Sequence, residues 1–190
     1  KRQSNNKFYS ANEDPLEIKS IFKQPNLAKT LSLISKKGAD EFYRGEIAKW
    51  ISEESLSNGG LITLEDMASY EAKYREPIET SYRGYKIISM APAASGGLVL
   101  LQTLNILENF DLKDSGHNSA ETIHILSEAM HRAYADRAEY HGDPDFYDVP
   151  IKQILSKQYS KDLSAQISGM RTPDGQIYEG DLKKYDESPD

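Results

Sequence analysis

The sequence predicts an α+β fold that is mostly helical and contains one short pair of strands. Apolar residues recur at helical spacing over much of the chain, as at Leu27 and Leu31. In the middle of the chain the pattern changes, and two runs rich in Ile, Thr and Tyr flank Arg83-Gly84. We find no internal repeat or low-complexity tract. At 190 residues, we therefore expect one domain segment over 1–190.

The first seventy residues predict an irregular connector followed by three helices. Residues from 1 to about 20 are rich in Asn, Ser, Lys and Asp, which is typical of a connector. The first helix should begin near Pro25 and end at Gly38, because these residues favour a helix start and a helix stop. The segment from Thr63 to Asp66 resembles a capping box. The three helices are expected over 25–38, 45–58 and 63–70.

The second part predicts a β-hairpin and then more helices. A tight turn at Arg83-Gly84 should join strands over 77–82 and 85–90. Ser119 is expected to cap the longest helix, and Pro150 to occupy the first position of a later one. Further helices are expected over 97–109, 119–142 and 160–167. Ile123, Leu126, Met130 and Tyr134 lie along one face of the longest helix. The segment from about 171 to 190 is polar and acidic, and we expect it to be extended.

Composition and charge exclude several classes of function. A net charge of −7 argues against a nucleic-acid partner, because phosphate binding needs clustered Lys and Arg. No apolar stretch approaches the roughly 20 residues that a membrane-spanning helix needs. The sequence has no cysteine, which excludes disulfides, thiolate nucleophiles and Cys-based zinc sites but does not fix the compartment. The sequence begins without Met or a signal peptide, and we interpret it as a segment of a longer protein.

The longest helix carries one candidate metal site. His124, Glu128 and His131 stand at i, i+4 and i+7, so they share a helix face and could offer two nitrogens and a carboxylate. The HExxH arrangement of zinc proteases is absent, and no fourth ligand is evident. The alternative is that His124 is a half-buried packing residue, and we predict no metal.

Two acidic segments near the end of this helix have alternative interpretations. Asp143-Pro144-Asp145 could suggest calcium, but it lacks the alternating oxygens and glycine of an EF-hand loop, and turn chemistry explains it better. Asp136 and Arg137 are adjacent charges in an apolar segment. They are interpreted as a structural ion pair or a subunit contact, with a catalytic aspartate as the alternative.

The loop from Ala91 to Gly97 could bind an anion or form a rigid entry to a helix. It lacks the dinucleotide-binding G-x-G-x-x-G, the Walker lysine and the G-x-S-x-G of a serine nucleophile. Ser95-Gly96-Gly97 could still present backbone N–H groups at a helix N-terminus. We predict a structural elbow without a catalytic group, since Pro92 fixes one backbone angle and the glycines permit close approach of another backbone.

Several ordered blocks of the chain resemble the large subunit of the γ-glutamyltranspeptidase family. The longest block is Asn58 to Gly97, NGGLITLEDMASYEAKYREPIETSYRGYKIISMAPAASGG. The others are QPNLAKTLSLISKKGADEFYRGEIA, LLQTLNILENFDL, EAMHRAYADRAEYHGDPDF and VPIKQIL. Together they cover nearly the whole chain from about Phe8. One departure is that the family's loop before Ser-Gly-Gly is rich in proline, whereas this chain has Ala91, Ala93 and Ala94.

The resemblance implies a fold, a partner chain and a place for the chemistry. It implies the helical portion of an N-terminal-nucleophile (Ntn) hydrolase αββα sandwich, completed by a small subunit cut from the same precursor. The terminal YDESPD matches the segment before that cut, so the carbonyl of Asp190 is the expected scissile group. The nucleophile would be a threonine that begins the partner, with its freed α-amine as base. No catalytic residue is expected on this chain, and no substrate-binding residue can be assigned to it.

The same resemblance implies an activity, and alternatives remain. The implied enzyme cleaves γ-glutamyl amides such as glutathione and passes the γ-glutamyl group to water, amino acids or peptides, without a cofactor. It would be exported, to the periplasm or outside the cell. An arginine that binds the substrate α-carboxylate would lie upstream of Lys1. One alternative keeps the fold with another donor, as in a cephalosporin acylase-like or poly-γ-glutamate-cleaving enzyme. The other is a non-catalytic helical scaffold or binding module that folds alone.

Overall fold

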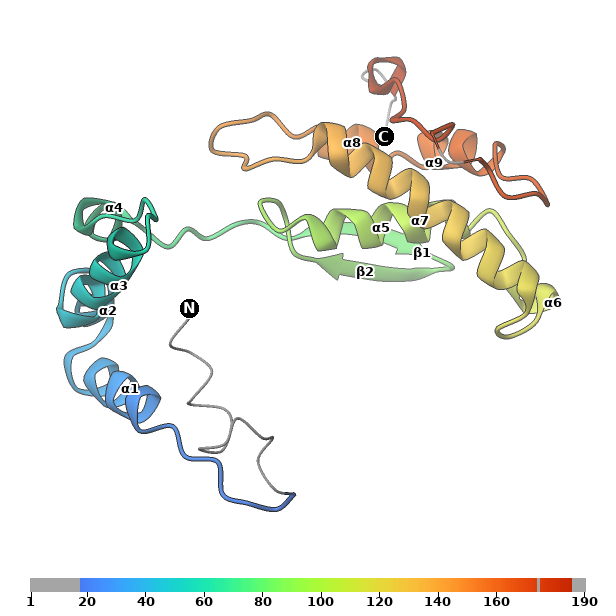
Figure 1. Ribbon diagram of the computed structural model, residues 1–190. Helices are drawn as coiled ribbons and strands as arrows, with labels where there is room; N and C mark the ends of the chain where they lie inside the picture. Colours follow the sequence, from blue (N-terminus) through green and yellow to red (C-terminus); the bar gives the residue numbers. More distant parts are fainter. Residues whose placement is uncertain (1–17, 174, 186–190) are drawn as a thin grey trace. The chain divides into compact units, whose positions relative to one another are not determined.

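The computed structural model describes residues 18–173 and 175–185, which are drawn in colour in Figure 1. The chain divides between Lys73 and Tyr74 into two compact units, and each is described by itself. None of the helices in the described ranges combines the length and apolarity that crossing a membrane requires.

From residue 18 onward, the first unit contains four helices. They are α1 (Pro25–Lys37), α2 (Ala39–Tyr43), α3 (Glu46–Ser57) and α4 (Leu64–Ser69). Three were expected, and the five-residue α2 was missed because it is too short to show a helical period. Buried Glu41 fixes the α2–α3 junction, since its carboxylate binds the Lys37 ammonium at 3.1 Å and accepts from the Glu46 N–H at 3.0 Å.

The cap signals in the first unit are confirmed. Gly38 ends α1 with a φ of 75°, a left-handed conformation that glycine adopts without strain. At α4, the Thr63 hydroxyl accepts from the Asp66 N–H at 3.1 Å, and the Asp66 carboxylate accepts from the Thr63 N–H at 2.8 Å. This reciprocal pair is a capping box, in which aspartate does the work of the usual glutamate.

The second unit begins with the expected hairpin. Strands β1 (Ile78–Tyr82) and β2 (Tyr85–Ser89) pair antiparallel, with Ile78 opposite Ser89 and Tyr82 opposite Tyr85. Arg83 and Gly84 connect them with φ angles of 49° and 83°. Two positive φ angles in a two-residue loop match the twist of the strands, which confirms the tight turn.

In the described part of the chain after the hairpin, the structure has six further elements. They are α5 (Ser95–Leu107), α6 (Leu112–Ser115), α7 (Ala120–Tyr140), α8 (Ile151–Ile154), α9 (Lys157–Ser164) and the 3-10 helix η2 (Leu182–Tyr185). Ser119 caps α7 as expected. Pro150 precedes α8 instead of opening it, and α9 begins earlier than expected because Ser156 caps it. The four-residue α6 was not predicted.

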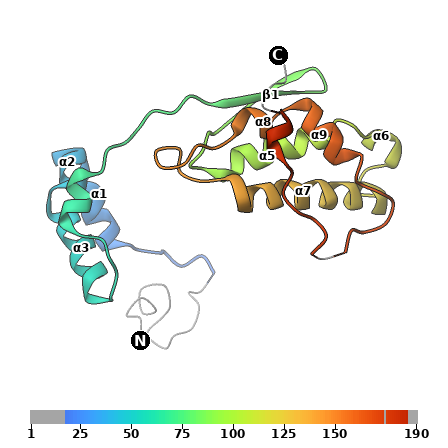
Figure 2. The ribbon, with the colours of Figure 1, turned by 90° about the horizontal axis from the view of Figure 1, so that it is seen from above.

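Helix α5 forms the centre of the second unit. It contacts β1, β2, α7, α8 and α9, and Figures 1 and 2 show α7 running beside it. Its apolar side chains are therefore buried around most of its circumference, and Leu98, Leu101 and Ile106 have no exposed surface. The helix that the sequence predicted over 97–109 is confirmed as α5.

The loop between β2 and α5 is the predicted elbow. It turns at Pro92, which is fully buried, and α5 begins at Ser95. The two glycines that follow differ in their surroundings. A methyl group at Gly97 would collide with the Met90 carbonyl oxygen, whereas one at Gly96 would meet nothing within 4 Å. The sequence suggested that both glycines allow another backbone segment to approach closely, but only Gly97 does so.

This difference gives a matched pair of substitutions. Gly97→Ala should lower the free energy of unfolding by about 1–3 kcal/mol, because the helix must move away from β2. Gly96→Ala should be neutral or raise it by up to ~1 kcal/mol, since alanine favours a helix over glycine. Urea unfolding of both variants in the full-length protein measures the difference. Equal effects of the two substitutions would show that the elbow is not closely packed at Gly97.

Candidate functional site

The most deeply buried polar group of α7 is the carboxylate of Asp136, which is 1% exposed. Its Oδ2 accepts from the Tyr159 hydroxyl at 2.6 Å and also from the Gln102 amide. Its Oδ1 accepts from the backbone N–H of Gly180 at 2.9 Å. Asp136 therefore connects α5, α7, α9 and the segment after α9.

Burial shifts the pKa values of the two acidic side chains in this cluster, Asp136 and Tyr159. Burial raises the pKa of Asp136 above its ordinary value, while the bonds from Tyr159, Gly180 and Gln102 act in the opposite direction. Burial and the neighbouring Asp136 also raise the pKa of Tyr159, so its hydroxyl keeps its proton and donates it. Both carboxylate oxygens of Asp136 are occupied by donors, which leaves neither open to a substrate.

Gly180 is held through both its backbone N–H and its backbone carbonyl. Its N–H reaches Asp136, and its carbonyl accepts from the Tyr140 hydroxyl at 2.7 Å, one turn further along α7. A methyl group on Gly180 would collide with the Tyr159 ring and hydroxyl. Only glycine fits there without moving Tyr159.

A second buried carboxylate lies two turns earlier on α7, at Glu128, which is 2% exposed. Its Oε2 binds the Arg132 guanidinium at 2.7 Å and the Thr172 hydroxyl at 2.6 Å, and its Oε1 accepts from the Thr172 N–H at 3.0 Å. Arg132 also donates to the Gln166 carbonyl at 3.2 Å. Burial opposes ionisation of Glu128, but the bonds from Thr172 and Arg132 outweigh it and lower its pKa to about 2.

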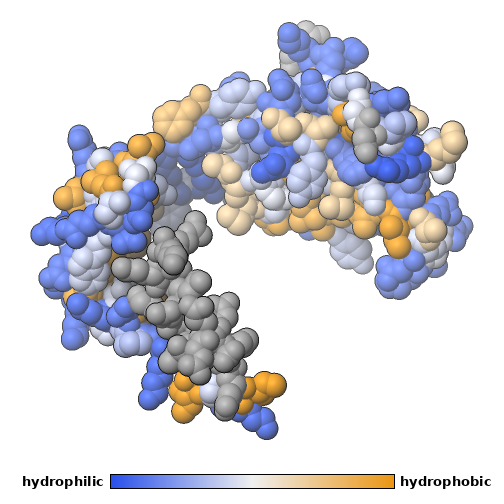
Figure 3. Space-filling model, in the orientation of Figure 1, coloured by the Kyte–Doolittle hydropathy of each residue, from blue (hydrophilic) through white to orange (hydrophobic). Residues whose placement is uncertain are grey.

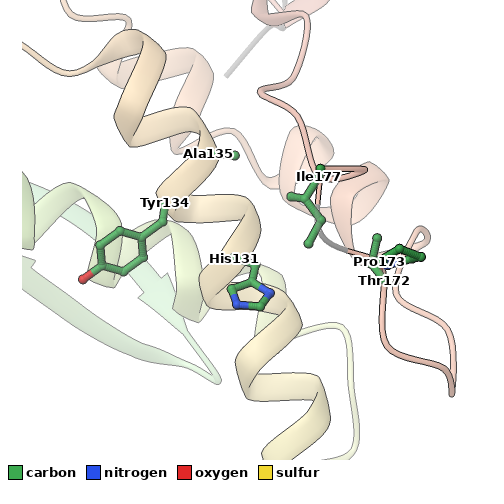
Figure 4. Close-up of a pocket in the computed structure, with 7 residues that line it drawn as sticks. His131, Tyr134, Ala135, Thr172, Pro173 and Ile177 are labelled. Atoms are coloured by element: carbon green, nitrogen blue, oxygen red, sulfur yellow. The ribbon is translucent and has the colours of Figure 1, made fainter.

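An open cavity of about 330 Å³ lies between the hydrogen-bond clusters of Glu128 and Asp136 (Figure 4). His131, Tyr134 and Ala135 of α7 line one side, and the other side is formed by residues after α9 that include Pro173 and Ile177. Figure 4 shows the rings of His131 and Tyr134 projecting from α7. Among the described residues that line this cavity, polar and apolar side chains are mixed and no set of donors converges on one point.

The face of α7 that the sequence marked as apolar is exposed in this chain. Ile123 and Tyr134 are 53% and 50% exposed, and Leu126 and Met130 are each 40% exposed. Figure 3 shows apolar side chains gathered on this unit. The opposite face is buried and carries the polar residues Glu128, Arg132 and Asp136. The buried face also carries Ile125, Ala129 and Ala133, so α7 has apolar side chains on both faces. An exposed apolar face of this kind is typical of a surface that packs against a further chain segment.

The three candidate metal ligands do not form a site. Glu128 is buried and fully occupied, as described above, whereas His131 is exposed on the cavity. The ring of His124 lies 2.7 Å from the Ser168 carbonyl oxygen, so it fixes the segment after α9. The interpretation of His124 as a partly buried packing residue fits these contacts.

Asp136 and Arg137 do not pair with each other, because they point away from α7 in different directions. Arg137 is exposed and its Nε donates to the Ser95 hydroxyl at 2.9 Å, at the start of α5. The three donors to Asp136 described above are all uncharged. The expected ion pair is therefore replaced by a buried hydrogen-bond cluster and a separate surface contact.

The Asp143-Pro144-Asp145 segment forms a turn, as the sequence indicated. The Asp143 carboxylate accepts from the Asp145 N–H at 3.0 Å, and its carbonyl accepts from the N–H groups of Phe146 and Tyr147. Arg75 then binds the Asp145 carboxylate at 2.8 Å. Asp190, the predicted processing residue, lies outside the described residues.

Sequence reasoning missed the partners that define the site. Gln102 lies in an apolar helix, and Tyr159, Thr172 and Gly180 lie far from α7 in the sequence. Their one local signal is that a polar Gln102 interrupts an otherwise apolar helix. A buried amide of this kind needs a partner, but periodicity cannot say which one.

The chain matches a family model over residues 1–189, and that model is described as gamma-glutamyltranspeptidase. It is 48% identical to the glutathione hydrolase proenzyme of Escherichia coli (strain K12) over 91% of this chain and 30% of that relative. The chain therefore spans about a third of the length of this curated relative.

Solved structures give the same result. The crystal structure of Helicobacter pylori gamma-glutamyltranspeptidase superposes with a TM-score of 0.84 at 43% identity, over 98% of this chain and 53% of that one. The cephalosporin acylase from Bacillus halodurans superposes with a TM-score of 0.73 at 30% identity, over 85% of this chain and 30% of that one. The described helices and hairpin are thus the mostly helical part of an Ntn-hydrolase fold, as expected.

The lowered pKa of Glu128 leads to a prediction about stability. The charged carboxylate stabilises the fold above its ordinary pKa of 4.5, and this stabilisation should be lost as the pH falls from there towards 2. Glu128→Gln should cost about 3 kcal/mol at pH 7, because Arg132 is left buried without its counter-charge. The difference between wild type and variant should shrink below pH 4.5.

Urea unfolding of the full-length protein between pH 7 and pH 2 measures this difference. Glu139→Gln, on the exposed side of the same helix, is the control and should change the free energy of unfolding by less than about 0.5 kcal/mol. A wild-type-to-Glu128→Gln difference that stays constant over this pH range would contradict the assignment.

Proposed function

Because the chain belongs to the γ-glutamyltranspeptidase family, we propose that it is the C-terminal part of the large subunit of an exported glutathione hydrolase and γ-glutamyltransferase. The observation that carries this proposal is the family match over residues 1–189, with 48% identity to a glutathione hydrolase proenzyme. The enzyme cleaves the γ-glutamyl amide of glutathione-like donors and passes the acyl group to water, an amino acid or a peptide.

The proposed precursor cuts itself after Asp190. The hydroxyl of the following threonine adds to the Asp190 carbonyl carbon, the C–N bond breaks, and the amide nitrogen takes up a proton to become the new α-amine. Water then hydrolyses the resulting ester and frees the Asp190 carboxylate. The product is a heterodimer of two chains from one precursor, which agrees with the word proenzyme in the name of the E. coli relative.

Catalysis then follows the same chemistry on a substrate. The threonine hydroxyl attacks the γ-glutamyl carbonyl carbon while the α-amine accepts its proton, and the amine product leaves with a proton. The acyl-enzyme ester is resolved by water or by an acceptor amine, which regenerates the threonine. Oxyanion stabilisation would come from the partner subunit. In this scheme the chain described here contributes the frame of the pocket and no catalytic group.

Exposed apolar side chains support the proposal that this chain packs against a partner subunit. Besides the apolar face of α7, Trp50 and Leu61 in the first unit are 38% and 87% exposed. A scaffold module that folds alone would bury such side chains. The second candidate function is an acylase with another donor, which the cephalosporin acylase superposition favours, although its identity of 30% is below the 43% of the transpeptidase.

Donor choice separates these two functions. We would assay the mature enzyme with a γ-glutamyl anilide and with a glutaryl-cephalosporin amide, which lacks the α-amino group. The first should be the better substrate by at least tenfold in kcat/KM. The opposite preference would favour the acylase.

The processing site gives a direct prediction. Mass spectrometry of the mature protein should find a large subunit that ends at Asp190 and a partner that begins with threonine. The freed tail carries several carboxylates, with Lys183 and Lys184 as the nearby cations, so it should repel itself and leave the pocket open to the donor. A different end, or a partner that does not begin with Thr, Ser or Cys, would overturn the N-terminal-nucleophile assignment.

The elbow gives a prediction about turnover. Ser95→Ala removes the hydroxyl that accepts from Arg137, and this bond lies at an exposed position. Turnover of the processed enzyme should stay within about tenfold of wild type, or roughly 1.4 kcal/mol of barrier. A loss of several orders of magnitude for Ser95→Ala in processed protein would make Ser95 a catalytic residue.

A further inference from the structure

The loop that follows α9 first runs outward along α7. Residues 167–173, all of which the structure describes, belong to no helix or strand. At the start of the loop, the Gln166 carbonyl accepts from Arg132 at 3.2 Å. Two residues later, the Ser168 carbonyl oxygen lies 2.7 Å from the ring of His124. Because His124 precedes Arg132 on α7, the loop heads towards the start of that helix.

The same loop then turns and comes back to a point between those two contacts. The chain bends at Gly169 and Met170, and Met170 is 78% exposed. The N–H and the hydroxyl of Thr172 then donate to the Glu128 carboxylate at 3.0 Å and 2.6 Å. Residues 166–172, which we call the strap, therefore have an outgoing arm and a return arm, and Glu128 holds the return arm.

The α7 side chains that hold the strap lie on one face of the helix. His124, Glu128 and Arg132 are spaced four residues apart, which places them in a row. Glu128 and Arg132 are 2% and 4% exposed and bind each other at 2.7 Å, so the strap lies over a charged pair. Charged groups regain their hydration when they are uncovered, and the strap therefore opens at a lower free-energy cost than a segment that covers apolar side chains.

The strap itself buries little apolar surface. Residues 168–171 are exposed, whereas Ile167, at the base of the outgoing arm, is partly buried against the core. Segments with few buried apolar contacts and exposed backbone open locally at a lower free energy than the whole domain unfolds. Helix α5 differs, because side chains around most of its circumference are buried.

We propose that the strap opens from α7 as one unit while the rest of the second unit stays folded, and that the Glu128 carboxylate is its latch. Glu128 closes the strap because it binds the return arm through two bonds, and both are strengthened by its negative charge. Removal of that charge weakens both bonds and also removes the counter-charge of Arg132. The opening is separate from the reaction proposed above and does not depend on it.

Hydrogen exchange of the full-length protein at pH 7 tests the opening. The readout is the backbone amide of Thr172, compared with the amide of Leu101 in α5, and electron-transfer fragmentation of peptic peptides resolves the two. After correction for intrinsic rates, Thr172 should exchange at least about a hundredfold faster than Leu101. Urea below the unfolding transition should leave the Thr172 rate unchanged and accelerate Leu101 steeply, because global unfolding exposes far more surface than local opening.

Two substitutions separate the latch from general stability. Glu128→Gln should raise the Thr172 exchange rate at least about tenfold, since a neutral amide is a weaker acceptor than a carboxylate. Lys157→Met removes an ammonium that ties α9 to the hairpin and to α5, so it destabilises the second unit at contacts outside the strap. Lys157→Met should accelerate exchange at Leu101 and leave Thr172 within about twofold of wild type.

Each outcome decides the proposal. A Thr172 amide that exchanges at the rate of Leu101, with the same dependence on urea, overturns it. An unchanged Thr172 rate in Glu128→Gln overturns it as well, and so does equal acceleration of both amides in Lys157→Met. If Glu128→Gln does not fold, His124→Ala decides, because it removes the ring that contacts the outgoing arm. It should raise the Thr172 rate about threefold, and an unchanged rate would contradict the strap.

Discussion

The second unit depends on one constraint, which is that the carboxylate of Asp136 is buried and must be supplied with donors. An unsatisfied charge in the interior costs several kcal/mol. Tyr159 from α9, Gln102 from α5 and the backbone of Gly180 meet this need together. Moving any of these elements would leave the carboxylate short of donors. The cluster therefore specifies how α5, α7, α9 and the following segment fit together, beyond what apolar packing alone would require.

Helix α7 also explains why this chain exposes apolar surface that a further segment or subunit could cover. Its buried face carries Glu128, Arg132 and Asp136, while Ile123 and Met130 lie on its exposed face. Polar groups inside bind segments of this chain by directional bonds, whereas the apolar stripe outside has no such partner among the described residues. Burial of that stripe would add hydrophobic stabilisation from another segment or subunit. A chain that spans about a third of its curated relatives is consistent with this arrangement.

In the proposed enzyme, the contacts suggest that this chain gives structural support while the partner subunit carries the nucleophile. The carboxylates that sequence reasoning considered as a metal ligand or a catalytic group are saturated by donors within this chain. Their role is to hold elements of this chain together. In the scheme proposed above, chemistry enters with the threonine of the partner, and this chain supplies the frame and the segment that is cut. The Lys157 ammonium likewise joins α9 to Asn105 of α5 and to Glu108, the residue that follows α5.

The sequence by itself determined the local elements, because their signals are local. Ser119 and the Thr63 capping box satisfied nearby N–H groups, and Arg83-Gly84 set the hairpin turn. The tertiary structure decided which face of α7 is buried, because an apolar stripe shows amphipathicity but not the identity of its partner. It also decided the roles of Asp136 and Glu128, whose partners lie 44 residues away at Gly180 and Thr172. Spacing within one helix could not reveal those bonds, since they form only when distant segments pack together.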